Sequence, residues 1–185
     1  MALTRARVIS ATPAFRSRID AVIRDVLTRR RETGVIASDV LEMRRAIAEE
    51  RGEDDIWDLK NAAGGIVDIE FIAQYLQLIH AADKPEILNV GTVQVLDNAA
   101  RLGVLAQADT DILRGASRLY HDLTQIIRLC VTGKFKPEIA GEDLLRVLTR
   151  AGDAPDFSAL EARVRETQSG VREVFLALLE GRSRK

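Results

Sequence analysis

Apolar residues recur at intervals of three and four along most of the chain, and the few prolines stand where this spacing fails. The 185 residues include four prolines, at positions 13, 85, 137 and 155. Because proline lacks a backbone donor and interrupts helices, these positions mark breaks between helices. Only five Phe, one Trp and two Tyr are present, so Leu, Ile, Val and Ala must fill the core, which favours packed helices over a sandwich. The sequence therefore predicts an all-α helical bundle of about seven helices.

The apolar spacing also predicts where the helices lie and which of them is central. Residues 65–82 carry two apolar stripes, one that includes Ile66 and another that includes Phe71. A helix that is apolar on two sides is expected near the centre of a bundle. We expect helices over residues 13–31, 38–52, 65–82, 90–102, 109–132, 141–151 and 156–180.

Polar residues and glycines at the expected helix ends indicate caps and domain limits. Ser38, Asp109 and Asp156 each precede an apolar repeat, as helix N-caps do. Glycines that follow helices suit a positive φ, and we expect this conformation at Gly103, Gly133 and Gly152. We divide the chain into residues 1–12, a bundle domain of residues 13–180 and a frayed tail of residues 181–185.

The composition excludes several classes of protein. There are 27 Lys and Arg against 28 Asp and Glu, a net charge of −1, so an overall basic footprint for nucleic acid is absent. No run of about 18 apolar residues is present, so we expect neither a membrane span nor a secretion signal. The single cysteine, Cys130, excludes an internal disulfide, and two histidines, His80 and His121, leave no zinc cluster. We expect a cytoplasmic protein in which Cys130 is a small buried side chain.

The segment from Asp58 to Phe71 differs from ordinary bundle sequence. As a strand it would direct Asp68 and Glu70 to one face, as in the metal-binding carboxylate pair of a nucleotidyltransferase. As a helix it would separate these carboxylates by about 200° of rotation. The apolar spacing continues to Ile79, and this favours the helix.

On the helical interpretation, Gly64 and Gly65 lead into a helix N-terminus, and two explanations stay open. Acidic side chains in a first turn stabilise a helix by about 0.3–1 kcal/mol each, so Asp68 and Glu70 can act as capping residues alone. The functional explanation is that the glycines let another chain or a phosphate approach the backbone closely, with Lys60 supplying charge.

The remaining candidate residues carry weaker signals. Trp57 stands in an expected loop, and we interpret it as an anchor for that loop rather than as a ligand-stacking residue. One expected helix carries Arg118, Tyr120, His121 and Arg128. Because His121 has no serine or cysteine partner at a defined geometry, it indicates no catalytic triad. For these four side chains we expect surface exposure or packing within the bundle.

The unusual segment also carries a family resemblance. It contains Leu-Lys at residues 59–60 and Gly-Gly-Ile-Val-Asp-Ile-Glu-Phe-Ile-Ala-Gln-Tyr-Leu at residues 64–76, and further support comes from residues 2–7, 84–85 and 96–105. Over most of residues 2–130 the chain resembles the glutamine synthetase adenylyltransferase family. Such proteins have two similar halves, each a nucleotidyltransferase domain followed by a helical bundle. One half attaches AMP from ATP to a tyrosine of glutamine synthetase, and the other removes it.

The resemblance implies a C-terminal helical domain of the adenylylating half, to which the Val67-Asp68 pair is similar, with residues 1–12 as the end of the upstream nucleotidyltransferase domain. The family's catalytic domain has a Gly-Ser turn and an Asp-x-Asp pair that holds Mg²⁺ at the ATP phosphates, and this sequence contains neither. We therefore expect no catalytic residue, no metal ligand and no activity from this chain alone. The resemblance implies a cleft-completing or interdomain role for Lys60, Gly64, Gly65, Asp68 and Glu70, which would face the upstream domain.

A second interpretation is an interaction module. Its surface would bind glutamine synthetase or a PII signalling protein, in nitrogen regulation, without a role in nucleotide chemistry. Neither interpretation includes a nucleic acid or a membrane as a partner.

Overall fold

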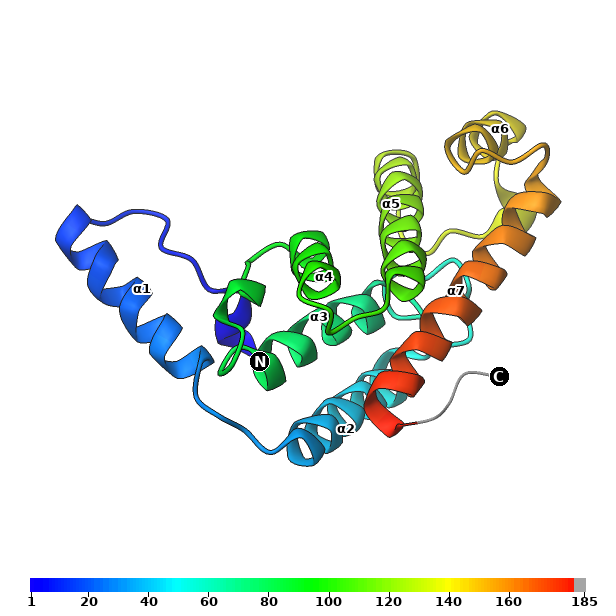
Figure 1. The fold of residues 1–185 in the computed structure, drawn as a ribbon. Coiled ribbons are helices and arrows are strands. Elements are labelled where there is room, and N and C mark those ends of the chain that lie inside the picture. The colour runs from blue at the N-terminus through cyan, green and yellow to red at the C-terminus, as the bar shows by residue number, and fades with distance from the viewer. Residues whose placement is uncertain (182–185) are drawn as a thin grey trace.

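The computed structural model describes residues 1–181, and these residues contain no strand. Seven α-helices follow one another in this part of the chain, with short 3-10 helices at Ala2–Arg5, Pro85–Ile87 and Pro137–Ile139 (Figure 1). The prediction of an all-α bundle is therefore confirmed. The helices are α1 (Pro13–Leu27), α2 (Thr33–Arg51), α3 (Ile66–His80), α4 (Thr92–Arg101), α5 (Gln107–Cys130), α6 (Glu142–Ala151) and α7 (Phe157–Glu180).

Helix α3 is the centre of the bundle. It packs against α2, α4, α5 and α7, and in Figure 1 it runs between α2 and α4. Eleven of its 15 residues are buried, because its apolar side chains occupy two sides of the helix rather than one. The prediction of a central helix over residues 65–82 is thus confirmed.

The prolines lie at breaks between helices, as the sequence predicts. Pro13 is the first residue of α1, where its missing N–H costs no intrahelical bond. Pro85 and Pro137 begin 3-10 helices. Pro155 precedes Asp156, whose Oδ1 accepts a hydrogen bond of 2.8 Å from the backbone N–H of Ala159. The prediction of Asp156 as an N-cap is confirmed.

Two other predicted N-caps are wrong. Helix α2 begins at Thr33 and continues through Ser38 without a break. Since Ala37 is already buried, the additional turn gains apolar contacts that outweigh the capping preference of serine. Helix α5 has Ala106 at its N-cap, and Asp109 is the third residue of the helix. An acidic side chain there still interacts favourably with the positive end of the helix dipole.

Two of the three glycines predicted to have a positive φ at a helix end do have one. Gly103 and Gly133 have φ of 68° and 91°. The prediction is wrong at Gly152, which has φ of −82°, while Asp153 takes the left-handed conformation with φ of 47°. Gly152 meets a steric requirement instead, because a Cβ there would lie 2.2 Å from a methyl group of Leu160.

The prediction that Cys130 is buried is also wrong, because Cys130 is exposed. Cys130 is the last residue of α5, and the buried residues of this helix end at Leu123. The last two turns of α5 therefore carry no fully buried side chain, and the neighbouring Leu129 is 85% exposed.

Trp57 anchors the loop between α2 and α3, as predicted. Its buried ring stacks on Phe157 at a centroid distance of 5.3 Å and meets Phe135 edge-on at 5.1 Å. These contacts join the loop to the start of α7 and to the segment after α5.

Two further predictions concern the ends of the chain. Residues 182–185 of the predicted tail lie outside the described residues, and the domain limits at residues 12 and 180 stay predictions. Within residues 1–181, no helix combines the length and the apolar character needed to cross a membrane.

Candidate functional site

The Gly64–Gly65 turn is closed by its own hydrogen bonds. Asp68, in the first turn of α3, accepts a 2.7 Å hydrogen bond at Oδ2 from the Gly64 N–H. The next amides donate to loop carbonyls, Gly65 to Ala62 at 2.8 Å, Ile66 to Leu59 at 2.9 Å and Val67 to Lys60 at 3.1 Å. Helix N-termini bind phosphate through free N–H groups. Here these four amides already have partners within the protein.

Asp68 is also the centre of a buried ionic network. Its side chain is fully buried, and its Oδ1 accepts a hydrogen bond from Nε of Arg44 on α2. Arg172 on α7 reaches its Oδ2 at 3.2 Å. Arg44 is itself buried and extends to Glu53 at 3.1 Å and to the Asn61 carbonyl at 3.1 Å. A carboxylate without water is tolerated here because two guanidinium groups and an amide replace its hydration.

Tyr120 on α5 fixes the other side of the turn. It is fully buried, and its hydroxyl donates a 3.0 Å hydrogen bond to the Gly64 carbonyl. Burial, with a smaller effect of the negative charge on Asp68, raises the pKa of the Tyr120 phenol above its usual range. The phenol therefore stays protonated and keeps donating at any physiological pH.

The two glycines are required by close packing. Gly64 has φ of 78°, and a Cβ there would lie 1.8 Å from the Gln168 carbonyl oxygen of α7. A Cβ on Gly65 would lie 2.7 Å from the Leu59 carbonyl oxygen. The side chain of Gln168 also donates a 2.8 Å hydrogen bond to the Ile56 carbonyl. The turn is thus the point at which α2, α3, α5 and α7 meet.

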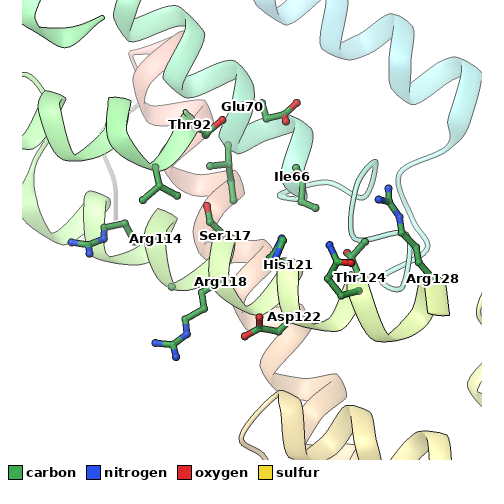
Figure 2. A pocket seen from close by; sticks show the side chains of 14 residues that line it. Ile66, Glu70, Thr92, Arg114, Ser117, Arg118, His121, Asp122, Thr124 and Arg128 are labelled. Carbon is green, nitrogen blue, oxygen red and sulfur yellow. The ribbon is translucent and has the colours of Figure 1, made fainter. Parts of the chain in front are cut away.

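Beside this turn, the first two turns of α3 form one wall of a groove of about 700 Å³ (Figure 2). The start of α4 and one face of α5 form the rest. Glu70 lies at the groove and pairs at 2.8 Å with Arg5 from the N-terminal segment. The lining includes Ile66, Ile69, Glu70, Thr92, Val93, Arg114, Ser117, Arg118, His121, Asp122, Thr124 and Arg128.

Helix α5 contributes a row of basic side chains to this groove. Arg114, Arg118, His121 and Arg128 recur at intervals of four, three and seven, which places them on one helical face. Arg114 pairs with Asp97 of α4 at 3.4 Å. Arg118 and Arg128 form no ion pair with the part of the chain that the structure describes. In Figure 2, Arg118 extends away from α3, whereas His121 points toward Ile66.

The structure brings four of the five predicted site residues together, and it brings only the backbone of the fifth, Lys60, whose carbonyl accepts a 3.1 Å hydrogen bond from the Val67 N–H. Gly64, Gly65 and Asp68 form the buried turn, and Glu70 follows at the groove. Lys60 is exposed on the preceding loop and outside the groove lining. Asp68 and Glu70 differ as helical spacing predicts, since one is buried and the other is partly exposed.

Sequence reasoning missed two polar residues that hold the turn, Arg44 beside Asp68 and Gln168 beside Gly64. Arg44 occupies a position on α2 that continues the buried stripe of Ala37 and Val40. Gln168 likewise continues the buried stripe of α7 with Val164 and Val171. A polar residue on an apolar stripe is the signal that could have identified both, because such a side chain must find a partner in the interior.

The groove and the turn contain no evident metal centre. Among the described residues, no group of three or more His, Cys, Asp or Glu side chains is placed to hold a metal ion.

Comparison with known proteins assigns the chain to a protein family. Residues 41–179 match the family described as GlnD PII-uridylyltransferase. The chain is also similar to proteins named bifunctional glutamine synthetase adenylyltransferase/adenylyl-removing enzyme. It is 71% identical over 183 residues to the one from Rhodopseudomonas palustris (strain BisB5), 72% over 180 residues to that of Bradyrhizobium sp. (strain ORS 278), and 49% over 180 residues to that of Xanthobacter autotrophicus. These matches cover 97–99% of this chain but only 18% of each relative.

Proposed function

Because this chain belongs to the family described as GlnD PII-uridylyltransferase, we propose that it is a helical domain that supports the transfer of a nucleotide to a protein. The names of its relatives make the reaction more specific. In this proposal the domain acts within a longer enzyme, beside a nucleotidyltransferase domain. That enzyme transfers AMP from ATP to a tyrosine of glutamine synthetase and so regulates nitrogen metabolism in the cytoplasm.

The observation that carries the proposal is the place of the groove. The segment that resembles the adenylyltransferase family forms one wall of it, and the basic row of α5 forms the opposite wall. Guanidinium groups bind phosphate and carboxylate groups through paired hydrogen bonds. Arg118 and Arg128 lie ten residues apart on α5, about 15 Å along its axis, so each can hold a different anionic group at the edge of a cleft between two domains.

The buried network has a positioning role in this proposal. Asp68 joins the start of α3 to α2 and α7, and Tyr120 joins the same turn to α5. These bonds fix the two walls of the groove relative to each other. A displacement of about 1 Å at a reacting centre can reduce a rate about a hundredfold, so a fixed wall contributes to activity without touching the substrate.

Glu70 has the interdomain role. Its partner Arg5 belongs to residues 1–12, the segment that we assign to the end of the upstream domain. Lys60, on the loop that precedes α3, is exposed and therefore accessible to the upstream domain. Mg²⁺ and ATP belong to the longer enzyme in this proposal, and we assign no metal ligand to the described residues.

The test uses the Rhodopseudomonas palustris relative with its matched region exchanged for this chain, which we call the exchanged enzyme. We expect Arg118→Ala with Arg128→Ala to lower kcat/KM for AMP transfer by about a hundredfold to ten-thousandfold, because each of the two lost charge-assisted bonds costs about 1.5–3 kcal/mol and about 1.4 kcal/mol is a factor of ten. Arg150→Ala on α6 is the matched control, since Arg150 is exposed and outside the groove. Unchanged transfer by the double variant would refute the proposal.

The same assay separates the interaction module. If the double variant has a higher KM for glutamine synthetase and an unchanged KM for ATP, the result favours a role in protein binding alone. A rise in KM for ATP, or a fall in kcat, would favour a cleft used in nucleotide transfer.

A further inference from the structure

Helix α1 presents an apolar seam that the described part of the chain covers only in part, since Ile19 and Val26 are half-buried whereas Phe15 and Val22 are exposed. Phe15, Ile19, Val22 and Val26 recur at intervals of four, three and four, which is the spacing of a seam that packs against another helix. Phe15 is 55% exposed and Val22 is 63% exposed. Apolar side chains in a continuous row at this exposure mark an interaction surface rather than scattered surface residues.

The rest of the chain holds α1 on a different side. Ile23 and Leu27 line a groove of about 340 Å³ with Leu88 and Val90. Among the described residues, the main hydrophobic core contains no side chain from α1. Figure 1 shows α1 projecting from the other helices near the N-terminal segment.

A helix in this position needs an additional contact to be stable. Helix α1 has 15 residues, and an isolated helix of about that length is marginal in water. In proteins, helix stability comes chiefly from burial of an apolar face. Burial of exposed Val and Phe side chains supplies such stabilisation, and the seam offers two that are still exposed, Phe15 and Val22.

The charges beside the seam indicate the chemistry of what covers it. Arg18, at the edge of the seam between Phe15 and Val22, forms no ion pair with residues 1–181. By contrast, Arg16 is held by the Val8 carbonyl at 2.9 Å. A covering helix would therefore place its own apolar seam on α1 and a carboxylate opposite Arg18.

We propose that this seam is the docking surface for an α-helix with acidic flanks that belongs to another domain of the same polypeptide. The match covers 18% of each relative, so more than four-fifths of such a polypeptide is available to supply that helix. A second copy of this chain fits less well, because neither carboxylate of its α1 is free to face Arg18: Asp25 pairs with Arg29 at 2.8 Å, and Asp20 lines the groove on the other side of the helix. The proposal does not depend on AMP transfer.

Hydrogen exchange of the backbone amides in residues 13–27 tests the proposal. It is measured in this chain alone and in the exchanged enzyme. We expect exchange in α1 to be at least about tenfold slower in the exchanged enzyme, because a docked helix opens less often. Equal exchange in the two proteins would overturn the proposal. If exchange in α1 of the chain alone is slow and becomes slower as the protein concentration rises, the seam binds a second copy of the chain and the proposal is overturned.

Variants identify the seam as the cause. Val22→Asp in the exchanged enzyme should return exchange in α1 to the rate of the chain alone. Ser17→Asp, on the same helix but off the seam and exposed, should leave the protection in place. Phe15→Ser is the second seam variant, and circular dichroism of each variant chain checks that the bundle is folded. Protection that survives both seam variants would overturn the proposal.

Discussion

Removal of the charge on Asp68 should destabilise the bundle strongly. Asp68→Asn keeps the size of the side chain and an acceptor for the Gly64 N–H. It leaves Arg44 buried with Glu53 as its remaining carboxylate, at 3.1 Å, and leaves Arg172 without Asp68. Breaking a buried ion pair by removal of one partner costs about 3–5 kcal/mol. For a domain of this size that corresponds to a fall in Tm of about 6–20 °C.

Urea and thermal unfolding followed by circular dichroism at 222 nm measure this effect. Glu70→Gln is the control on the same helix, because its partner Arg5 is half exposed and such pairs contribute only about 0–1 kcal/mol. Combining Asp68→Asn with Arg44→Met should cost less than the sum of the single changes, since the double variant leaves no guanidinium of Arg44 unpaired. A loss for Asp68→Asn as small as that for Glu70→Gln would refute the assignment of Asp68 as the centre of the network.

Three further changes test other parts of the account. Gly64→Ala should lower the free energy of unfolding by about 2–5 kcal/mol, because it introduces left-handed strain and overpacking against Gln168. Gly115→Ala is the control: its Cβ would meet open space, so it should raise the free energy of unfolding by about 0.5–1 kcal/mol. Equal effects of the two substitutions in urea unfolding would contradict the close approach at the turn. Tyr120→Phe should cost about 1–3 kcal/mol, because the buried Gly64 carbonyl loses its donor, and an unchanged urea midpoint would contradict that bond. Burial lowers the pKa of His80 below 6.5, so its neutral form stabilises the fold above pH 6.5, and this contribution is lost as the pH falls. Between pH 7 and pH 5, the His80→Gln variant should therefore lose less stability than the unchanged chain. Identical pH profiles of the two proteins would contradict the lowered pKa.

The order of helices could be predicted from the sequence because it depends on local spacing. Helix α3 is the clearest case, since its two apolar stripes specify both its conformation and its central place. The helix ends were less predictable. Burial at Ala37 extends α2 past the capping signal at Ser38, and a contact with Leu160 rather than backbone conformation explains Gly152.

The function of the unusual segment could be predicted only in part. Its residues stand out in the sequence, but the partners that define their roles are distant along the chain. Arg44, Tyr120 and Arg172 come from three different helices, and no local pattern relates them to Asp68. The groove is likewise formed by α3, α4 and α5 together, so its basic wall is visible only once the helices are packed.

AMP transfer from labelled ATP, with Mg²⁺, to glutamine synthetase tests directly whether the bundle supports nucleotide transfer. It compares this chain alone, the Rhodopseudomonas palustris relative without its matched region, and the two mixed. We expect no transfer by either part and transfer by the mixture, because the bundle completes a cleft whose catalytic groups lie in the other part. Transfer by this chain alone, or equal transfer by the shortened relative with and without the chain, would contradict a supporting role.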